Sequence, residues 1–338
     1  MRKVSIIETL LFIINLLLAT PLLFSYLLAY VSPTQAPTLS LLNMGIPPLI
    51  IANGIFTLYW ILKLKKKFLL SLCVLIIGYQ HVNAFIQLSE KKTFLNNDVK
   101  IMSYNVRSFN AYKWSKKKHL NDTIFQFIKK KDPDILAIQE YFPLKKGEIE
   151  LPYSYNKKNS TKSSVWLAIY SKHKIINKGS LNFKKSANNA LFADIVVQED
   201  TLRVYNVHLQ SLRIDKNKEN FGQKNSEKLI TRFKNTFKKQ VEQVNEITAH
   251  QKKSPYKTII TGDFNNTAFS WAYKQLKKDK NDAFIEAGSG LGKSFDYIFP
   301  FRIDFILADK RLKINHFKTY KTNHSDHYPI MARINMGS

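Results

Sequence analysis

The chain opens with three apolar stretches, each bounded by polar or charged residues. They cover residues 6–31, 45–62 and 68–86, and the third is interrupted by polar residues near its centre. A helix of about 20 apolar residues crosses the ~30 Å hydrocarbon core of a bilayer. The pattern therefore predicts an N-terminal membrane anchor over residues 1–89 that contains three transmembrane helices.

The basic residues around these stretches predict an orientation. Arg2 and Lys3 precede the first stretch and four lysines lie within residues 63–67, whereas residues 32–43 contain neither Lys nor Arg. Positive charge marks the cytoplasmic side of a span. We therefore expect a multi-pass protein of the cell inner membrane. If the third stretch crosses, as we expect, the chain beyond residue 90 lies outside the cytoplasm; if it does not, that part of the chain is cytoplasmic. A cleaved signal peptide is the alternative for the first stretch, but its apolar run is too long and a second span follows.

From residue 98 onward the pattern changes to short runs of β-branched and aromatic residues between polar segments. Such runs predict strands, here over residues 99–106, 135–139, 165–170, 192–197, 202–208, 257–262, 303–307 and 328–334. Apolar residues at three- to four-residue spacing predict helices over 120–131 and 226–251. The polar segments 145–164 and 215–225 are expected to be loops that face a substrate. Many strands with few helices indicate one layered α/β domain over residues 90–338.

Charge and cysteine content narrow the class of protein. The chain has 338 residues and a net charge of +27, from 52 Lys and Arg against 25 Asp and Glu. Residues 1–89 hold six of these bases and one of these acids, so most of the excess belongs to the second part. A basic domain attracts phosphate-rich partners or anionic membranes. The single cysteine, Cys73, excludes an internal disulfide and a cysteine-based zinc cluster.

Short polar motifs follow the predicted strands. They read Ser-Tyr-Asn-Val from residue 103, Gln-Glu from 139, Asn-Val-His-Leu from 206 and Gly-Asp-Phe-Asn from 262, and then Arg-Ile-Asp-Phe-Ile from 302 with Ser-Asp-His-Tyr-Pro from 325. Carboxylate and amide oxygens suit Mg²⁺, Mn²⁺ or Ca²⁺. Histidines transfer protons near neutral pH. Together the motifs predict a metal-assisted attack of water on a phosphate ester.

In this order the motifs resemble those of the endonuclease/exonuclease/phosphatase superfamily, over about residues 98–336. That superfamily includes pancreatic-type deoxyribonucleases, abasic-site endonucleases, neutral sphingomyelinases and inositol polyphosphate 5-phosphatases. The resemblance implies an α/β fold, a four-layered sandwich in which two packed, mostly antiparallel sheets are flanked by helices. In this chain the sandwich would follow the N-terminal helical transmembrane region.

The resemblance also implies roles for individual residues. The metal-binding positions are Asn105, Glu140 and Asp326. Asp263 and Asn265 would position the attacking water and the phosphate, and His208 would stabilise the phosphate or act as general acid. Asp304 would orient His327, and either His327 or Asp263 would be the general base.

The implied activity is Mg²⁺-dependent hydrolysis of a phosphodiester, with Mn²⁺ or Ca²⁺ as other suitable ions. The substrate is either a nucleic acid, which the basic domain favours, or a phospholipid or sphingolipid head group, which the membrane anchor favours. A phosphomonoesterase of the same fold and a non-catalytic, membrane-tethered binding module stay open as alternatives. The chain is expected to be a monomer.

Overall fold

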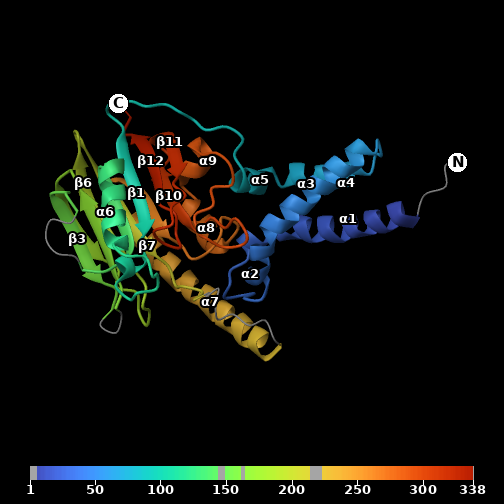
Figure 1. The fold of residues 1–338 in the computed structure, drawn as a ribbon, viewed down its shortest axis with the longest axis horizontal. Coiled ribbons are helices and arrows are strands. Elements are labelled where there is room, and N and C mark those ends of the chain that lie inside the picture. The colour runs from blue at the N-terminus through green and yellow to red at the C-terminus, as the bar shows by residue number, and fades with distance from the viewer. Residues whose placement is uncertain (1–5, 144–148, 161–163, 214–222, 338) are drawn as a thin grey trace.

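The computed structural model describes residues 6–143, 149–160, 164–213 and 223–337, without the side chains of 223–225. The described chain divides into an arm of helices, residues 6–85, and an α/β domain that begins at residue 99. The arm projects from one side of the domain, and its longer helices lie alongside one another (Figure 1).

The arm consists of α1 (Ile6–Ser25), η1 (Leu28–Tyr30), α2 (Leu39–Leu42), η2 (Asn43–Gly45), α3 (Ile46–Leu62), α4 (Phe68–Ile77) and α5 (Tyr79–Phe85). Two helical segments, Ile6–Tyr30 and Leu39–Leu62, are long and apolar enough to cross a membrane. The third predicted span corresponds to a pair of helices, α4 and α5, bent by 81°, which adds a third candidate span if the pair crosses as one broken span. At 1.5 Å per residue, the 10 residues of α4 cover about 15 Å, which is half of a bilayer core.

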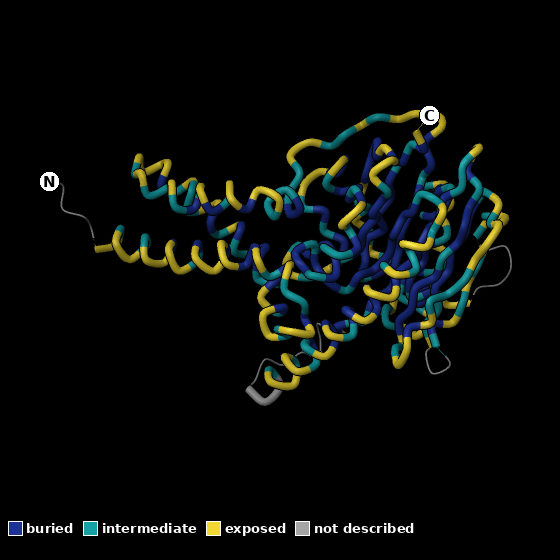
Figure 2. The backbone as a smooth tube through the Cα atoms, turned by 180° about the vertical axis from the view of Figure 1, so that it is seen from behind, coloured by how far each residue is buried: buried dark blue, intermediate teal, exposed yellow. Residues whose placement is uncertain are grey.

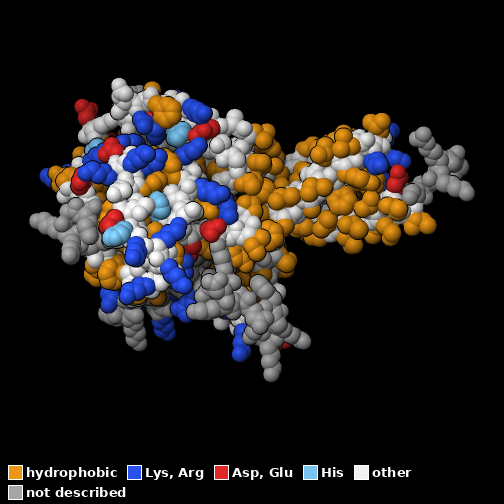
Figure 3. Space-filling view, in the orientation of Figure 1, with side chains coloured by type: hydrophobic (Ala, Val, Ile, Leu, Met, Phe, Trp, Pro, Cys, Tyr) orange, Lys and Arg blue, Asp and Glu red, His pale blue; other side chains and the backbone are white. Residues whose placement is uncertain are grey.

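Apolar side chains cover the outside of the arm, and polar side chains pair inside it. Exposed positions include Ile13 and Leu17, and Figures 2 and 3 show an exposed, hydrophobic arm with charged side chains at its tip. Inside, the Asn15 amide donates a hydrogen bond to the Ser71 hydroxyl (2.6 Å), which donates to Asn53 Oδ1 (2.9 Å). Polar groups that pair between helices, with apolar groups outside, suit a helix bundle in lipid.

The α/β domain contains two six-stranded sheets packed face to face. The first has the order β11-β12-β1-β2-β4-β3, formed by β1 (Val99–Asn105), β2 (Ile135–Tyr141), β3 (Tyr153–Lys158), β4 (Trp166–Ser171), β11 (Lys313–Thr319) and β12 (Ile330–Asn335). The second has the order β5-β6-β7-β8-β10-β9, formed by β5 (Ile175–Ser180), β6 (Asn189–Val197), β7 (Asp200–His208), β8 (Lys257–Asp263), β9 (Lys280–Asp282) and β10 (Asp304–Asp309). In each sheet one pair of neighbours is parallel, β1 with β2 and β7 with β8, and the others are antiparallel.

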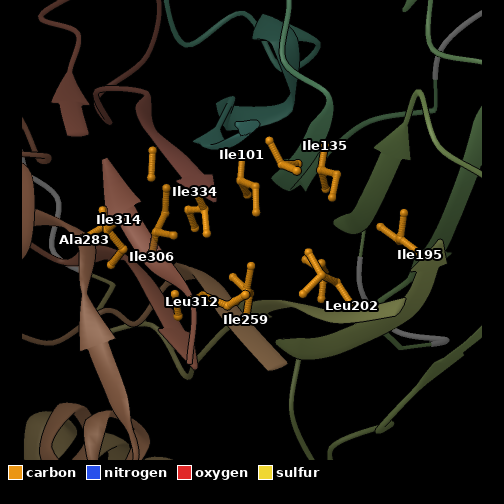
Figure 4. Close-up of a cluster of buried hydrophobic side chains, with 14 of the residues drawn as sticks. Ile101, Ile135, Ile195, Leu202, Ile259, Ala283, Ile306, Leu312, Ile314 and Ile334 are labelled. Carbon is orange, nitrogen blue, oxygen red and sulfur yellow. The ribbon is translucent and has the colours of Figure 1, made fainter. Parts of the chain in front are cut away.

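Side chains that alternate along the strands fill the layers of this sandwich. Ile101 and Ile259 lie in the core between the sheets (Figure 4), whereas the next residues, Met102 and Ile260, pack outward against helices. The helices of the domain are η3 (Arg107–Asn110), α6 (Leu120–Lys131), α7 (Gln223–Lys252), α8 (Trp271–Lys277) and α9 (Ala283–Ala287). Helix α6 covers the first sheet, and α7 and α8 cover the second. The predicted α/β sandwich is confirmed.

The four strands that the sequence pattern does not predict are β3, β5, β9 and β11. These are the edge strands of the two sheets. Edge strands are less buried and carry polar residues, as in β3, where no residue is fully buried. The predicted loop 145–164 therefore contains a strand. Most of the predicted loop 215–225 lies outside the described residues, and its end belongs to α7.

The arm packs on the domain through several contacts, which include Met44 and the carbonyl of Ala84. Met44, just before α3, packs against the apolar cluster of Leu212 and Phe237. The guanidinium of Arg302 donates a hydrogen bond to the carbonyl oxygen of Ala84 in α5 (3.1 Å). The α/β domain therefore lies at the same end of the arm as the turn that joins the first two candidate spans.

Candidate active site

The predicted site residues lie at strand ends that the two sheets bring together at one edge of the sandwich. Asn105 ends β1, and its amide nitrogen lies 3.3 Å from Glu140 Oε1 in the parallel strand β2. His208 ends β7 directly opposite Asp263 at the end of β8, and Asp263 lies opposite Asp304 at the start of β10. Five residues from different motifs therefore meet across the sandwich.

Gly262 allows the close approach of β7 and β8 at this edge. Its φ angle is 134°, and a side chain there would collide with the carbonyl oxygen of Val207. Glycine alone accepts this backbone geometry without strain. The approach places His208 Nε2 3.5 Å from Asp263 Oδ2.

Asp263 is the centre of the polar network. Its Oδ2 accepts a hydrogen bond from the Asn105 amide (3.0 Å) and lies 3.7 Å from His327 Nε2, while Oδ1 accepts from the backbone N–H of Asn265 (2.8 Å). Burial raises the pKa of Asp263 to about 7, and the nearby Asp304 carboxylate acts in the same direction, against the opposing effect of His327. Asp263 can therefore exchange a proton near neutral pH.

His327 lies between two carboxylates. Its Nδ1 is 3.0 Å from Asp304 Oδ2, and both residues are buried. Burial lowers the pKa of His327, but the charges of Asp304 and Asp263 outweigh it and raise that pKa to about 10. The ring is therefore a cation that is held on one side by Asp304 and faces Asp263 with the other.

Glu140 reaches the site through an irregularity in β2. The register between β2 and β4 shifts between Ile138 and Tyr141, and Glu140 itself has a φ of 48°. A residue other than glycine costs of order 1–3 kcal/mol in that region, and such strain clusters at functional sites. The bulge turns the carboxylate into a cavity instead of leaving it over the sheet.

Glu140 and Asp326 suit a divalent cation. Both line the same cavity, and burial followed by the charge of Asp326 raises the pKa of Glu140. A cation between two carboxylates would remove their repulsion, and Mg²⁺ prefers such oxygen ligands. Asn105 is already bonded to Glu140 and can hold that ligand in place. The residues present therefore fit the metal that the sequence predicts.

Asp263, Asp304 and His327 form a second group with ligand-type atoms within 4.8 Å of one another. Both ring nitrogens of His327 face carboxylates in this group, at 3.0 and 3.7 Å. A cationic imidazole has no lone pair for a metal. We therefore interpret this group as a proton-transfer network.

The cavity in front of these residues has a volume of about 260 Å³. It is lined by Glu140, Asp263, Asn265, Asp326 and His327. Asn105, Asp304 and His208 are buried and are not among the lining residues. They lie behind the cavity wall, where they contact the residues that line it.

The resemblance implies that His208 contacts the phosphate, but in the structure His208 is buried and does not line the cavity. Neither of its ring nitrogens has a hydrogen-bond partner among the described residues. Burial, together with the charge of His327, lowers the pKa of His208 to about 3. The ring lies beside Asp263, with Nε2 3.5 Å from Oδ2, and its role at the phosphate stays a prediction.

Arg107 is a site residue that sequence reasoning misses. Its guanidinium lies 3.1 Å from Asp326 Oδ2 and 4.6 Å from the ring centre of Trp114, and it lines the cavity. Residues 107–110 all have positive φ values, which folds the chain tightly after β1. The feature of the sequence that could have identified Arg107 is its position as a basic residue directly after the Ser-Tyr-Asn-Val motif.

Two other motif residues hold the sheets together. The buried Gln139 amide donates to Asn206 Oδ1 (2.7 Å), and the Asn206 amide donates to the backbone carbonyls of Ile138 and Ala168 (2.8 Å each). Gln139 belongs to the first sheet and Asn206 to the second. Their hydrogen bonds fix the distance between the two halves of the site.

Comparison with protein families gives two matches. Residues 102–327 match the family described as endonuclease/exonuclease/phosphatase. Residues 8–85 match a domain of unknown function, DUF8431. No curated protein matches the chain.

Solved structures share the fold of the α/β domain. An endonuclease/exonuclease/phosphatase protein from Bacteroides vulgatus has a TM-score of 0.52 at 19% identity, over 70% of this chain and 98% of its own. TDP2 of D. rerio, complexed with a single-strand DNA product, has a TM-score of 0.53 at 17% identity, over 71% and 100%. A mannosyl-6-phosphatase from Bacteroides thetaiotaomicron has a TM-score of 0.50 at 16% identity, over 70% and 99%.

Proposed function

The chain belongs to the endonuclease/exonuclease/phosphatase family, and we propose that it is a membrane-anchored, metal-dependent phosphoesterase that hydrolyses a phosphodiester with an activated water. The observation that carries this proposal is the convergence of Glu140, Asp263, Asn265, Asp326 and His327 on one cavity. In the reaction the water oxygen bonds to phosphorus, the bond to the alcohol oxygen breaks, and that oxygen gains a proton. The lining residues include groups for each of these changes.

Glu140 and Asp326 would hold Mg²⁺, or Mn²⁺ or Ca²⁺, with Asn105 orienting Glu140. When bound, such an ion neutralises phosphate charge and lowers the pKa of a bound water. Arg107 lies beside Asp326 and offers a planar set of donors that matches phosphate oxygens.

Asp263 is the proposed proton acceptor from water, and His327 is the proposed proton donor to the leaving alcohol oxygen. The raised pKa of Asp263, about 7, suits a base near neutral pH. The raised pKa of His327, about 10, favours a ring that already carries a proton. Asp304 fixes the ring through Nδ1, which leaves Nε2 to face the reacting groups.

The proposed topology has three membrane crossings, with the α/β domain outside the cytoplasm. The segment between α1 and α3 packs on the domain through Met44. The lysines of residues 63–67 lie at the opposite end of the arm, where Lys65 pairs with Glu8 (3.2 Å). If α1 and α3 both cross, the chain leaves α3 on the side of the membrane opposite to the domain, so α4 and α5 must bring it back. The end of the arm that carries the lysines of residues 63–67 belongs to the cytoplasm.

The fold neighbours include TDP2 with a DNA product and a mannosyl-6-phosphatase, so the test compares a diester with a monoester. Full-length protein in detergent, with Mg²⁺, should hydrolyse bis-p-nitrophenyl phosphate faster than p-nitrophenyl phosphate. Asp263→Asn should remove the activity, and Asp279→Asn, at an exposed position, should retain it. A preference for the monoester would favour a phosphatase. Absence of hydrolysis of both would favour a binding module.

A further inference from the structure

The lining of the candidate-site cavity contains two chemically different sets of residues. The polar set includes the proposed catalytic residues with Arg107 and Arg213. The apolar set consists of Met44, Leu212, Phe295, Tyr297, Phe301 and Ile303. Its aliphatic members offer no hydrogen bond to a phosphate or a base edge. The apolar set is therefore suited to an apolar part of the substrate.

Met44 connects the apolar set of lining residues to the membrane arm. It lies in η2, two residues before Ile46, where α3 begins. Two residues of extended chain cover at most about 7 Å, which is about the depth of the head-group layer on one side of a bilayer. If α3 crosses the membrane, the cavity therefore opens at the level of the lipid head groups.

An exposed apolar loop lies between Tyr297 and Phe301, which both line the cavity. Ile298 is 89% exposed and Phe299 is 43% exposed. The neighbouring rings of Phe295 and Tyr297 are stacked (centroids 6.2 Å apart), and the Phe295 ring lies 5.0 Å from that of His327. Large apolar side chains gathered at a site opening indicate contact with a membrane or an apolar ligand. The loop joins this exposed surface to the reacting residues.

We propose that the substrate is an amphiphilic phosphate ester, whose apolar chain remains in the membrane while its phosphate group enters the cavity. The loop 296–300 rests in the lipid surface and, with Met44 and Leu212, guides the apolar chain. This inference rests on the proposed function and adds the substrate class. A polynucleotide is the competing class, but it would leave the aliphatic wall formed by Met44, Leu212 and Ile303 without a partner.

Three phosphodiesters with the same p-nitrophenyl leaving group test the substrate class. Their second alcohols are methanol, dodecanol and the 5′-hydroxyl of thymidine, so the P–O bond that breaks is the same in all three. The full-length protein is assayed with Mg²⁺ in nanodiscs of phosphatidylethanolamine and phosphatidylglycerol. We expect kcat/KM for the dodecyl ester to exceed that for the methyl ester by about 100-fold or more, because the apolar chain is bound only in the dodecyl ester.

The variant Ile298→Ser/Phe299→Ser tests the loop. Both side chains are exposed, so their replacement should change stability little. We expect kcat/KM for the dodecyl ester to fall by about tenfold or more, with the methyl ester changed less than about twofold. Ile176→Ser is the matched control, since Ile176 is also exposed but lies in the edge strand β5 of the second sheet. It should change neither rate.

The results separate failure of this inference from failure of the proposed function. Equal rates for the methyl and dodecyl esters, or a preference for the thymidine ester, would overturn the amphiphilic substrate while leaving a phosphodiesterase. A loop variant that slows both esters equally, or neither, would overturn the role of the loop. Absence of Mg²⁺-dependent hydrolysis of all three esters would instead overturn the proposed function.

Discussion

The Nδ1 atom of His327 lies 3.0 Å from Oδ2 of Asp304, and both side chains are buried. Asp304 begins β10, whereas His327 lies in the segment before β12 in the other sheet. The hydrogen bond therefore joins the two sheets at the candidate site and fixes the direction of the imidazole. Its Nε2 is left facing Asp263 at 3.7 Å.

This relationship predicts that Asp304 and His327 act as a unit. His327→Ala should lower kcat/KM by about 10²–10⁴-fold, the usual contribution of a proton-transferring side chain. Asp304→Asn should lower it less. In the double variant the losses should be far from additive, because an orienting carboxylate has little effect once the ring is absent. A double-mutant cycle on kcat/KM measures this. Additive losses would mean that the two residues act separately.

A second prediction concerns the metal. Glu140→Gln should abolish Mg²⁺-dependent hydrolysis with little change in stability, because the side chain faces a cavity and its replacement has the same shape. Glu286→Gln, on the exposed side of α9, is the matched control and should keep the wild-type rate. Rates measured against Mg²⁺ concentration, with and without EDTA, give the result. Activity that resists EDTA, or that survives in the Glu140 variant, would contradict a metal role.

The sequence pattern predicts the central parts of the domain well because these parts have one clear hydrophobic period. Helix α6 matches its predicted range, Leu120–Lys131, since Leu120, Ile124 and Ile128 form one buried stripe. The motif-bearing strands are central in their sheets and buried. Their parallel pairs, β1 with β2 and β7 with β8, bring the motifs together.

Other features depend on contacts that no local pattern contains. The edge strands lack the alternation of a half-buried strand, and β3 has mostly exposed residues. Met44 lines the cavity only because the arm packs on the domain. The buried position of His208, without a hydrogen-bond partner among the described residues, depends on the packing of β7 against β8.

A third prediction concerns the joint between arm and domain. The buried Arg302 Nη1 lies 2.7 Å from Asp282 Oδ2, and the same guanidinium donates to Ala84 in α5. Arg302→Met should lower stability by about 3–5 kcal/mol because it leaves the buried Asp282 carboxylate without its cationic partner, with only the hydrogen bonds from Tyr273 and Phe284 remaining. Arg311→Met removes an exposed pair with Asp309 (2.8 Å) and should cost under about 1 kcal/mol.

Thermal unfolding of the full-length variants in detergent measures this difference. At about 2–4 °C for each kcal/mol, Arg302→Met should lower the melting temperature by roughly 6–20 °C. The Arg311 variant should change it by a few degrees at most. Equal shifts in the two variants would show that the buried pair does not hold the joint.

The last prediction concerns topology, since the proposed access to a membrane substrate depends on which segments cross. Alkaline phosphatase is active only outside the cytoplasm, so its fusion after Lys92 should be active and its fusion after Lys66 inactive. Green fluorescent protein, which fluoresces only when folded in the cytoplasm, should give the reverse at both positions. The reason is that Met44 and the domain pack at one end of the arm, while the lysines of residues 63–67 lie at the other. Phosphatase activity at neither position would mean that α4 and α5 do not return the chain across the membrane. The domain would then be cytoplasmic, and because Met44 packs on it, α1 and α3 could not cross the membrane either.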